Sequence, residues 1–353
     1  MSVDFLMNGA AHGNIAQRLM ACDFDPSCLR PYLADDGVTP LITANQNGEY
    51  KELVTNAPAL LRKDEWIQLD TAIIKVAKQR LRAFADLRSR GLTYSVPNAM
   101  GSPVLQYQAI SDITEATISM DGLRQSEEDR PAFELRNLPL PIIHKDFSFT
   151  AREIAPSRKG GSPLDTTTAE LAARRVAEEV EKLTLGVSNT YSYGGGAVYG
   201  YTNFPQRITT TVTDPSVGTF SGSTLVGEIL DMIQLANNAN YFGPWLLYFS
   251  RDWNRYLDDD YSGVKGDLTV RQRLQQIEDL SLVRTLDYLT GYQVILVQAT
   301  SDVVRAVIGM DVTTIQWETH GGMRLHFKVM AIQVPQLRSD YDEAAGVIHA
   351  VTA

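Results

Sequence analysis

The chain has 353 residues, of which 44% are hydrophobic and 21% are charged, and its net charge is −10. This composition excludes wholesale disorder and is typical of a globular protein with two or three domains. The pI of about 5.1 and the excess of acidic residues argue against a basic surface for specific nucleic-acid binding. Two cysteines, Cys22 and Cys28, are too few for a disulfide-stapled secreted domain. With no signal peptide pattern and no apolar run long enough to span a membrane, we expect a soluble protein made inside the cell.

The first ninety residues predict an arm followed by a helix. Residues 1–62 mix Gly, Pro, Asn and Asp with short apolar patches such as PLITAN, which indicates an extended arm. Residues 64–91 predict one helix that ends at Gly91. Its members at three- and four-residue spacing are Ile73, Ala77, Leu81, Phe84 and Arg88.

Residues 103–150 predict a long two-stranded excursion. VLQYQAISDITEATISMDG alternates apolar and polar residues, as half-buried strands do. RQSEEDRP predicts a charged turn, and FELRNLPLPIIHKDFSFTAREI predicts a second pair of strands that leads back.

The strongest helix signal covers about residues 167–185. Thr167 and Glu170 have the spacing of a capping box, and Gly186 closes the C-terminus. An apolar stripe runs along one face: Ala169, Ala172, Ala173, Val176, Val180 and Leu183. We expect the acidic residues Glu178, Glu179 and Glu181 to be solvated.

The second half of the chain predicts a compact α/β unit. QRITTTVTDPSVGTFSGST reads as a strand and a loop, and a helix at 225–238 leads to the buried strand PWLLYFS. A helix at 270–280 and the strand YQVILVQA follow, and then DVVRAVIGM. Two further strands, DVTTIQWET and RLHFKVMAIQVP, complete the prediction.

No constellation of residues predicts catalysis or metal binding. The three glycines at 194–196 follow a helix, whereas a phosphate-binding loop precedes one, so they indicate a flexible helix exit. DDDYSG (258–263) resembles the start of a calcium loop but has Thr269 where a bidentate Glu is needed, which favours a solvated acidic turn. No Gly-x-Ser-x-Gly elbow occurs.

Histidine and cysteine give no closer match to a metal site. His12, Cys22, Cys28, His320 and His326 lack the paired spacing of a zinc site, and His326 lies in a strand pattern that favours an ordinary packed residue. The sequence therefore predicts no enzyme, no cofactor and no metal.

The order of these elements resembles the Hong Kong 97-like coat fold of tailed-bacteriophage major capsid proteins and encapsulin shells. DEWIQLDTAIIKVAKQRL resembles the helix before the shell core, and LPLPIIHKDFSFTAREI with LDTTTAELAARRVAEEVEKLTLG resembles the E-loop return and spine helix. GGGAVYGYTNFP and GPWLLYFSRDWNRYL resemble the segment after the spine helix and the axial-domain strand and helix. The likeness covers residues 60–340.

The resemblance implies an α+β fold with four parts. They are an N-terminal arm (1–62), an E-loop hairpin (103–145), a peripheral domain (63–102, 146–220 and 311–353) with the spine helix, and an axial α/β domain (221–310). Gly194, Gly195 and Gly196 would then be a backbone pivot between the spine helix and the sheet.

The implied function is that of a major capsid protein, which assembles into the hexamers and pentamers of an icosahedral virion head around dsDNA. Assembly would take place in the host bacterial cytoplasm, with no membrane, with a scaffolding protein acting in trans and a portal, and with a decoration or cementing protein as a further partner. Packaged dsDNA would be close to the shell without specific contacts. The alternative is an encapsulin-like shell around a cargo enzyme; the length of the arm favours the phage.

Two details concern contacts between subunits. Between Gly101 and His144 the chain has no lysine, the residue with which some relatives cross-link their shells, so we expect a non-covalent shell. Charges near the E-loop tip are the candidate inter-subunit contacts, with a merely solvated turn as the equal alternative. They are Arg124, Glu127, Glu128, Asp129 and Arg130.

Overall fold

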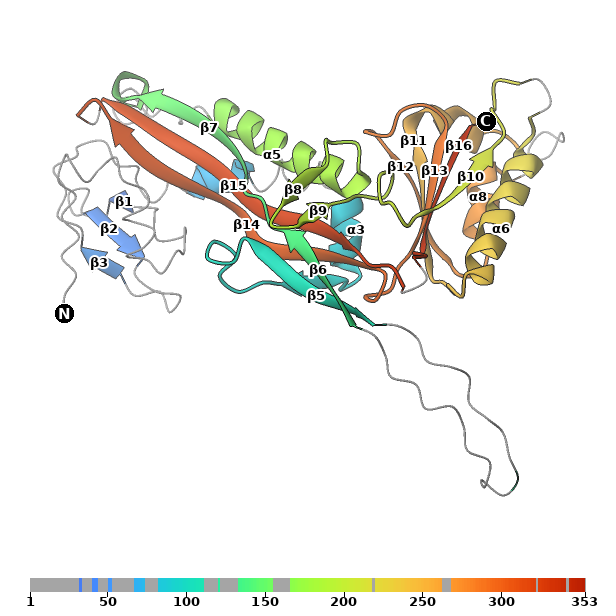
Figure 1. The fold of residues 1–353 in the computed structure, drawn as a ribbon. Coiled ribbons are helices and arrows are strands. Elements are labelled where there is room, and N and C mark those ends of the chain that lie inside the picture. The colour runs from blue at the N-terminus through green and yellow to red at the C-terminus, as the bar shows by residue number, and fades with distance from the viewer. Residues whose placement is uncertain are drawn as a thin grey trace.

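The structure, a computed structural model, places two sheets side by side along an elongated molecule (Figure 1). It describes residues 67–73, 82–110, 120, 133–154, 166–217, 220–261, 268–321, 323–340 and 343–352, and the backbone of three short strands before them. Those strands lie within the predicted arm and form a small antiparallel sheet: β1 Tyr32–Leu33, β2 Pro40–Thr43 and β3 Tyr50–Glu52. None of the helices in these described residues is long and apolar enough to cross a membrane.

The first sheet is built around one very long hairpin. Its order is β4-β14-β15-β7, with β4 parallel to β14 and the other pairs antiparallel. The bounds are β4 Thr93–Ser95, β14 Val304–Thr319, β15 Arg324–Leu337 and β7 Ile143–Thr150. The strand predicted at 311–319 is part of a longer one, β14, which has register shifts on either side of Met310.

A long helix, α5 (Thr167–Leu185), lies on this sheet along β7 and β15. Small residues on one face of α5 meet the rings of Phe147, Phe149 and Phe327. Phe147 and Phe327 stack at 5.1 Å, which fills the space above the alanines of the helix. The predicted helix is confirmed, and Gly186 ends it with φ 81. The predicted capping box is wrong, because the N-cap is Thr166 and its side chain makes no capping bond.

A two-stranded hairpin projects from the other side of the first sheet. β5 (Val104–Ile110) and β6 (Phe133–Pro139) pair antiparallel from Val104–Pro139 to Ile110–Phe133. The base of the hairpin packs through Leu138 and Leu140 on Val307 and Val334 of the first sheet. The predicted two-stranded excursion is confirmed over these strands.

The second sheet is mixed, in the order β10-β16-β13-β11-β12. Its strands are β10 Ile208–Val212, β16 Val347–Thr352, β13 Gln293–Gln298, β11 Trp245–Ser250 and β12 Leu280–Leu286. β10 runs parallel to β16, and β11 runs parallel to β12. β13 is antiparallel to both of its neighbours, β11 and β16. The sequence analysis assigned residues 208–212 and 347–352 to the peripheral domain. In the structure they form β10 and β16 and pair in the same sheet as β11 and β13.

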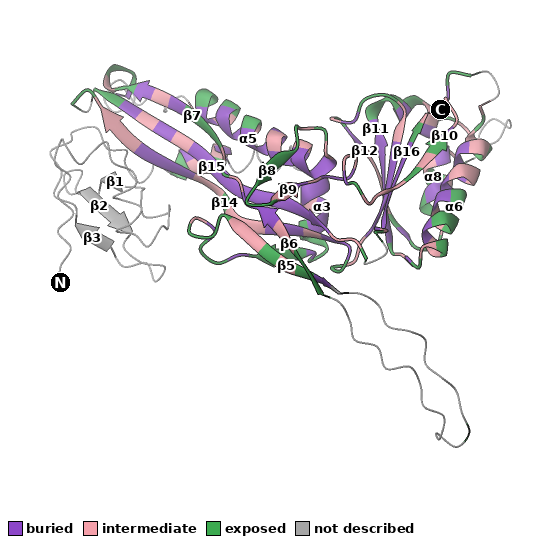
Figure 2. Cartoon of the chain, viewed as in Figure 1, coloured by how far each residue is buried: buried purple, intermediate pink, exposed green. Residues whose placement is uncertain are grey.

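Helices pack on the second sheet, and β11, which lies between β13 and β12, is buried along its whole length (Figure 2). The longest, α6 (Gly222–Asn238), is capped by the Ser221 side chain and matches the prediction at 225–238. α8 (Val270–Gln275) has a complete capping box but is shorter than the predicted 270–280, because the chain turns into the edge strand β12, which was not predicted. The 3-10 turn η2 (Arg251–Trp253) and α7 (Asn254–Leu257) follow β11.

The predicted helix over 64–91 is wrong as one element. Residues 67–73 are helical, and a separate helix, α3, spans Ala83–Ser89. Ile73 and Phe84 belong to different hydrophobic clusters, so the two stretches pack on different partners. Gly91, with φ 73, follows α3 as predicted.

The triple glycine forms a tight turn of a small hairpin. β8 (Tyr191–Tyr193) and β9 (Gly196–Val198) pair through Tyr193 and Gly196. Gly194 and Gly195 occupy the two turn positions with φ 61 and φ 77, the backbone that a type I′ turn requires.

Substituting the last of these glycines is expected to destabilise the fold. A Cβ on Gly196 would lie 2.0 Å from the backbone oxygen of Asn137 on β6. We therefore expect Gly196→Ala to lower the free energy of unfolding by about 1–3 kcal/mol, measured by denaturant titration. Gly227→Ala is the control: it lies in α6 with open space around its Cβ position and should be stabilising by about 1 kcal/mol. Equal effects of both substitutions would contradict the close packing.

Candidate functional site at the junction of the two sheets

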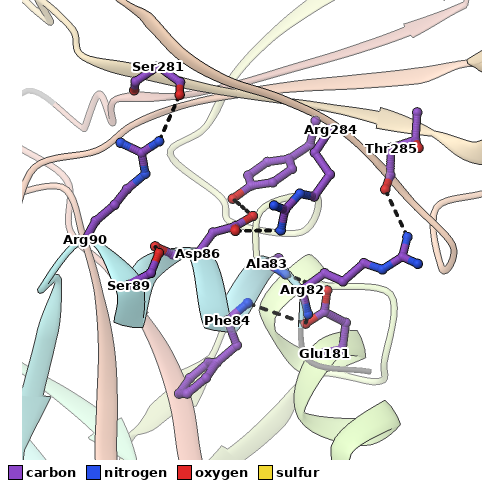
Figure 3. Close-up of polar contacts among 11 residues, drawn as sticks. Arg82, Ala83, Phe84, Asp86, Ser89, Arg90, Glu181, Ser281, Arg284 and Thr285 are labelled. Carbon is purple, nitrogen blue, oxygen red and sulfur yellow. Dashed lines mark hydrogen bonds and ion pairs between the residues drawn. The ribbon is translucent and has the colours of Figure 1, made fainter. Parts of the chain in front are cut away.

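The short helix α3 lies between the two sheets, and a glutamate from another helix caps it. The carboxylate of Glu181 on α5 accepts hydrogen bonds from the backbone N–H of Arg82 (3.1 Å), Ala83 (2.8 Å) and Phe84 (3.4 Å) (Figure 3). The first N–H groups of a helix have no partner inside it, and no side chain at the N-cap of α3 supplies one. Glu181 thus fixes where α3 begins and ties it to α5.

Burial makes Glu181 a weak acid for a glutamate. Only 2% of the residue is exposed, and burial raises its pKa to about 7, although the three N–H groups favour the charged form. The nearby charge of Asp86 raises the pKa further. Glu181 therefore changes charge near neutral pH.

Asp86, one turn further along α3, ties the helix to the second sheet. Arg284 of β12 donates from Nη1 to its Oδ1 at 2.6 Å, and the Tyr248 hydroxyl of β11 donates to its Oδ2 at 3.2 Å (Figure 3). Burial raises the pKa of Asp86, while the Arg284 charge opposes that shift. Charge-assisted bonds of this kind are the strong ones among side-chain contacts.

Two more arginines, at the two ends of α3, contact the edge strand β12. Arg90 donates to the Ser281 carbonyl at 3.0 Å, and Arg82 donates to the Thr285 carbonyl at 3.5 Å and lies 3.5 Å from Asp287. With Arg284 between them, three contacts follow β12 over 281–285 (Figure 3). This spacing sets the position of the second sheet relative to α3.

Tyr201 completes the junction from the segment after β9. Its ring stacks on Tyr248 with centroids 6.1 Å apart, and its buried hydroxyl has no hydrogen-bond partner among the described residues. Burial, followed by the charges of Glu181 and Asp86, raises the pKa of Tyr201. The phenol therefore stays neutral beside two carboxyl groups.

The arrangement connects elements rather than activating a nucleophile. Its acids accept bonds from backbone N–H, guanidinium and phenol, which positions α3, α5 and the second sheet against one another. Within the described residues, no cluster of three or more His, Cys, Asp or Glu is arranged to hold a metal ion.

The expectation of a solvated acidic face on α5 is wrong for two of its three residues. Glu178 is 4% exposed and ion-paired with Arg174 at 2.7 Å and Arg175 at 2.9 Å. Glu181 is the buried cap, whereas the Glu179 side chain is 42% exposed. A signal existed in the sequence: Glu181 lies four residues after Ala177 and four before Leu185, both on the buried face.

Of the other sequence candidates, those that the structure describes lie away from this junction. Gly194, Gly195 and Gly196 form the β8–β9 turn, where the Gly194 carbonyl accepts from the Asn137 amide at 2.9 Å, and their role as a pivot stays a prediction. Arg124, Glu127, Glu128, Asp129 and Arg130 lie outside the described residues, as do His12, Cys22 and Cys28.

The calcium-like and histidine positions have ordinary partners. Asp258 of the calcium-like turn pairs with Arg271 at 2.9 Å. His326 stacks on Trp317 and hydrogen-bonds Thr319. Asp86, Tyr248 and Arg284 were not singled out from the sequence, because nothing local brings residues so far apart together.

Comparisons with known proteins bear on the fold and the family. A family model described as "Family of unknown function (DUF6260)" matches residues 56–350. The type 1 encapsulin shell protein EncA of Myxococcus xanthus (strain DK1622) is 26% identical over 223 residues, covering 60% of this chain and 69% of that protein.

Two solved structures resemble the chain over most of their length. The virus-like particle from Pyrococcus furiosus matches with TM-score 0.55 and 15% identity, covering 81% of this chain and 98% of that one. The capsid of Myoviridae phage XM1 matches with TM-score 0.57 and 10% identity, covering 75% and 90%. The α+β fold is that of the Hong Kong 97-like coat proteins, as the sequence resemblance implied.

Proposed function

The chain belongs to DUF6260, a family of unknown function, and we propose that it is a self-assembling shell subunit, the major capsid protein of a tailed bacteriophage. Its copies form hexamers and pentamers that close into an icosahedral head around dsDNA. The fold it shares with a phage capsid and a virus-like particle supports the proposal, as does its similarity to a shell protein.

The observation that carries the proposal is the β5–β6 hairpin. It projects from the body of the molecule, and its residues Phe133 and Leu135 lie on one face and are 61% and 58% exposed. Adjacent apolar side chains left open on a projecting element favour contact with another molecule. A neighbouring copy in a shell would cover them.

In this proposal, each domain of the subunit corresponds to one of the two sheets. The axial domain corresponds to the second sheet with α6 and α8, and so includes 208–212 and 347–352 in addition to most of the predicted 221–310. The peripheral domain corresponds to the first sheet with α5, and the E-loop to the β5–β6 hairpin and the residues between its strands. The junction at α3 joins the two domains.

The remaining features of the proposal come from the family resemblance and the chain's charge. The subunit is structural rather than enzymatic, is part of the virion, and assembles non-covalently in the bacterial cytoplasm with a scaffolding protein, a portal and a decoration or cementing protein. The net charge of −10 suits a wall that does not clamp the DNA inside it.

A second candidate is an encapsulin-like shell that encloses a cargo enzyme. The similarity to the encapsulin shell protein of Myxococcus xanthus favours it. Electron microscopy of the protein expressed alone, with light scattering for mass, separates the candidates by shell diameter. A monomer or small oligomer that forms no shell even with a scaffold added would overturn both.

Removing the apolar face of the hairpin is expected to prevent assembly. We expect Phe133→Ser with Leu135→Ser to abolish shells or raise the subunit concentration needed for assembly at least about tenfold, because two buried apolar contacts are lost. Light scattering against concentration measures this. Leu171→Ser is the control: this leucine is similarly exposed (55%) but lies on α5 and not on the projecting hairpin, so its substitution should change assembly little. Normal shells from the double variant would remove the main support for the proposal.

A further inference from the structure

A hollow of about 500 Å³ opens between β8 and the root of the β5–β6 hairpin. Buried side chains form its floor, and exposed side chains form its rim. The floor includes Leu140, Ile315 and Met330, and the rim includes Ile142, Tyr191 and Tyr193. The three rim residues are 43%, 45% and 54% exposed. Large apolar side chains left open around one hollow mark a site of contact with another molecule.

No unpaired charge in this hollow opposes the entry of an apolar group. The basic side chains that line it are Lys328 and His144, and both lie 3.5 Å from the Asp146 carboxylate. Among the described residues that line the hollow, none has a buried polar side-chain atom without a hydrogen-bond partner. An apolar side chain can therefore enter without leaving a charge buried and unmatched, which would cost free energy.

The hairpin carries a matching apolar feature toward its far end. Phe133 and Leu135 are 61% and 58% exposed and lie on one face of β6, because side chains two residues apart in a strand share a face. Glu134 and Arg136 point to the opposite face and pair with each other at 2.8 Å. The face with Phe133 and Leu135 has no charged residue within the two strands.

The hairpin cannot fill the hollow of its own chain. Pro139 at the root of β6 lines the hollow, whereas Phe133 lies six residues further out along the same strand. A strand rises by about 3.4 Å per residue, so the two residues are about 20 Å apart. A hairpin that occupies the hollow must therefore come from another molecule.

We propose that the hollow beside β8 receives Phe133 and Leu135 from the hairpin of a second copy, a contact that rests on the proposed shell function. A cavity of about 150 Å³ holds a benzene ring, so the hollow has room for a phenyl ring and a leucine side chain. Burial of apolar surface on both sides drives the association.

The position of the two surfaces fits a ring of subunits. Each copy carries a hairpin and a hollow at different places, so the contact runs head to tail. Head-to-tail contacts close into rings when the rotation between neighbours allows it. Hexamers and pentamers are rings of this kind.

A double-mutant cycle tests whether the two surfaces touch. Leu135→Asp and Ile142→Lys each place a charge in the apolar contact, and we expect each to raise the subunit concentration needed for assembly at least about tenfold. Light scattering against concentration measures this. The double variant should recover much of the loss, because its two charges pair across the contact. Leu171→Asp with Ile142→Lys is the control and should show no recovery, since Leu171 lies on α5. Both contact positions are exposed, so the melting temperatures of the unassembled variants should stay near that of wild type.

A disulfide provides a second readout. In a chain with Cys22 and Cys28 replaced by serine, we expect Phe133→Cys with Ile142→Cys to form covalent multimers on oxidation, up to pentamers and hexamers on a denaturing gel without reductant. A bond within one chain is excluded, because a disulfide needs Cα atoms within about 7 Å. Phe133→Cys with Leu171→Cys is the control and should give no such ladder.

Four results would overturn this docking. If wild type forms shells and both single charge variants assemble like it, the shell function stands and the contact fails. If Leu135→Asp blocks assembly and Ile142→Lys does not, the hairpin binds elsewhere on its neighbour. If the double variant shows no recovery and the cysteine pair gives no ladder, the two surfaces do not touch. If wild type forms no shell even with a scaffold added, the shell function fails and the docking fails with it.

Discussion

Replacing Arg284 by methionine is expected to lower the free energy of unfolding by about 3 kcal/mol. Asp86 would stay buried with only the Tyr248 hydrogen bond and the charge of Arg90 to stabilise its carboxylate, and removing one partner of a buried ion pair commonly costs about 3–5 kcal/mol. The Arg284 side chain is 39% exposed, which places the effect at the lower end. Denaturant unfolding of the unassembled subunit measures the loss. We choose pH 8 because a high pH favours the ionised form of Asp86.

The same helix provides a matched control for this prediction. Arg88 of α3 makes a two-pronged contact with Asp311 at 2.9 Å and 3.3 Å, but both side chains are more than half exposed. Arg88→Met should therefore cost at most about 1 kcal/mol. Asp86→Asn combined with Arg284→Met should recover much of the loss, because no unpaired charge remains and Tyr248 keeps an acceptor. Equal losses for Arg88→Met and Arg284→Met would show that Asp86 is not a buried charge.

The elements that sequence analysis identified well are those whose pattern is local. α5 repeats its apolar residues every three or four positions and ends at a glycine, so its bounds are readable from the sequence. β11 and β13 are continuous apolar runs that are buried on both faces. The sequences of β5 and β6 alternate apolar and polar residues, and the charged segment 124–131 lies between them in the sequence.

What the sequence could not supply depends on contacts between distant residues. The separate start of α3 depends on Glu181, nearly a hundred positions away, because that carboxylate satisfies the N–H groups that a continuous helix would have used internally. β12 and β16 lie in the second sheet only because neighbouring strands pair with them, and β12 carries a mixed pattern that resembles a helix end. The junction of Asp86, Tyr248 and Arg284 likewise exists only in the folded chain.

The second large effect is a pH dependence of stability that comes from Glu181. An unfolded glutamate has a pKa near 4.5, whereas burial raises that of Glu181 to about 7 in the folded protein. Between these values the folded state holds a proton that the unfolded state has lost, so its contribution to stability is complete below pH 4.5 and is lost as the pH rises through 7. A difference of this size corresponds to a contribution on the order of 3 kcal/mol.

Glu181→Gln isolates this contribution because glutamine resembles the protonated acid at every pH. The variant's stability relative to wild type should rise by on the order of 3 kcal/mol between pH 4 and pH 8, measured by denaturant unfolding of unassembled protein. Taking the difference removes other titrations, such as that of His349, whose pKa burial lowers to about 4 and which therefore acts in the opposite direction. Glu179→Gln, on the same helix with its side chain 42% exposed, is the control and should give a flat difference. A flat difference for Glu181→Gln as well would mean that the three N–H bonds at the start of α3 outweigh burial and keep Glu181 ionised.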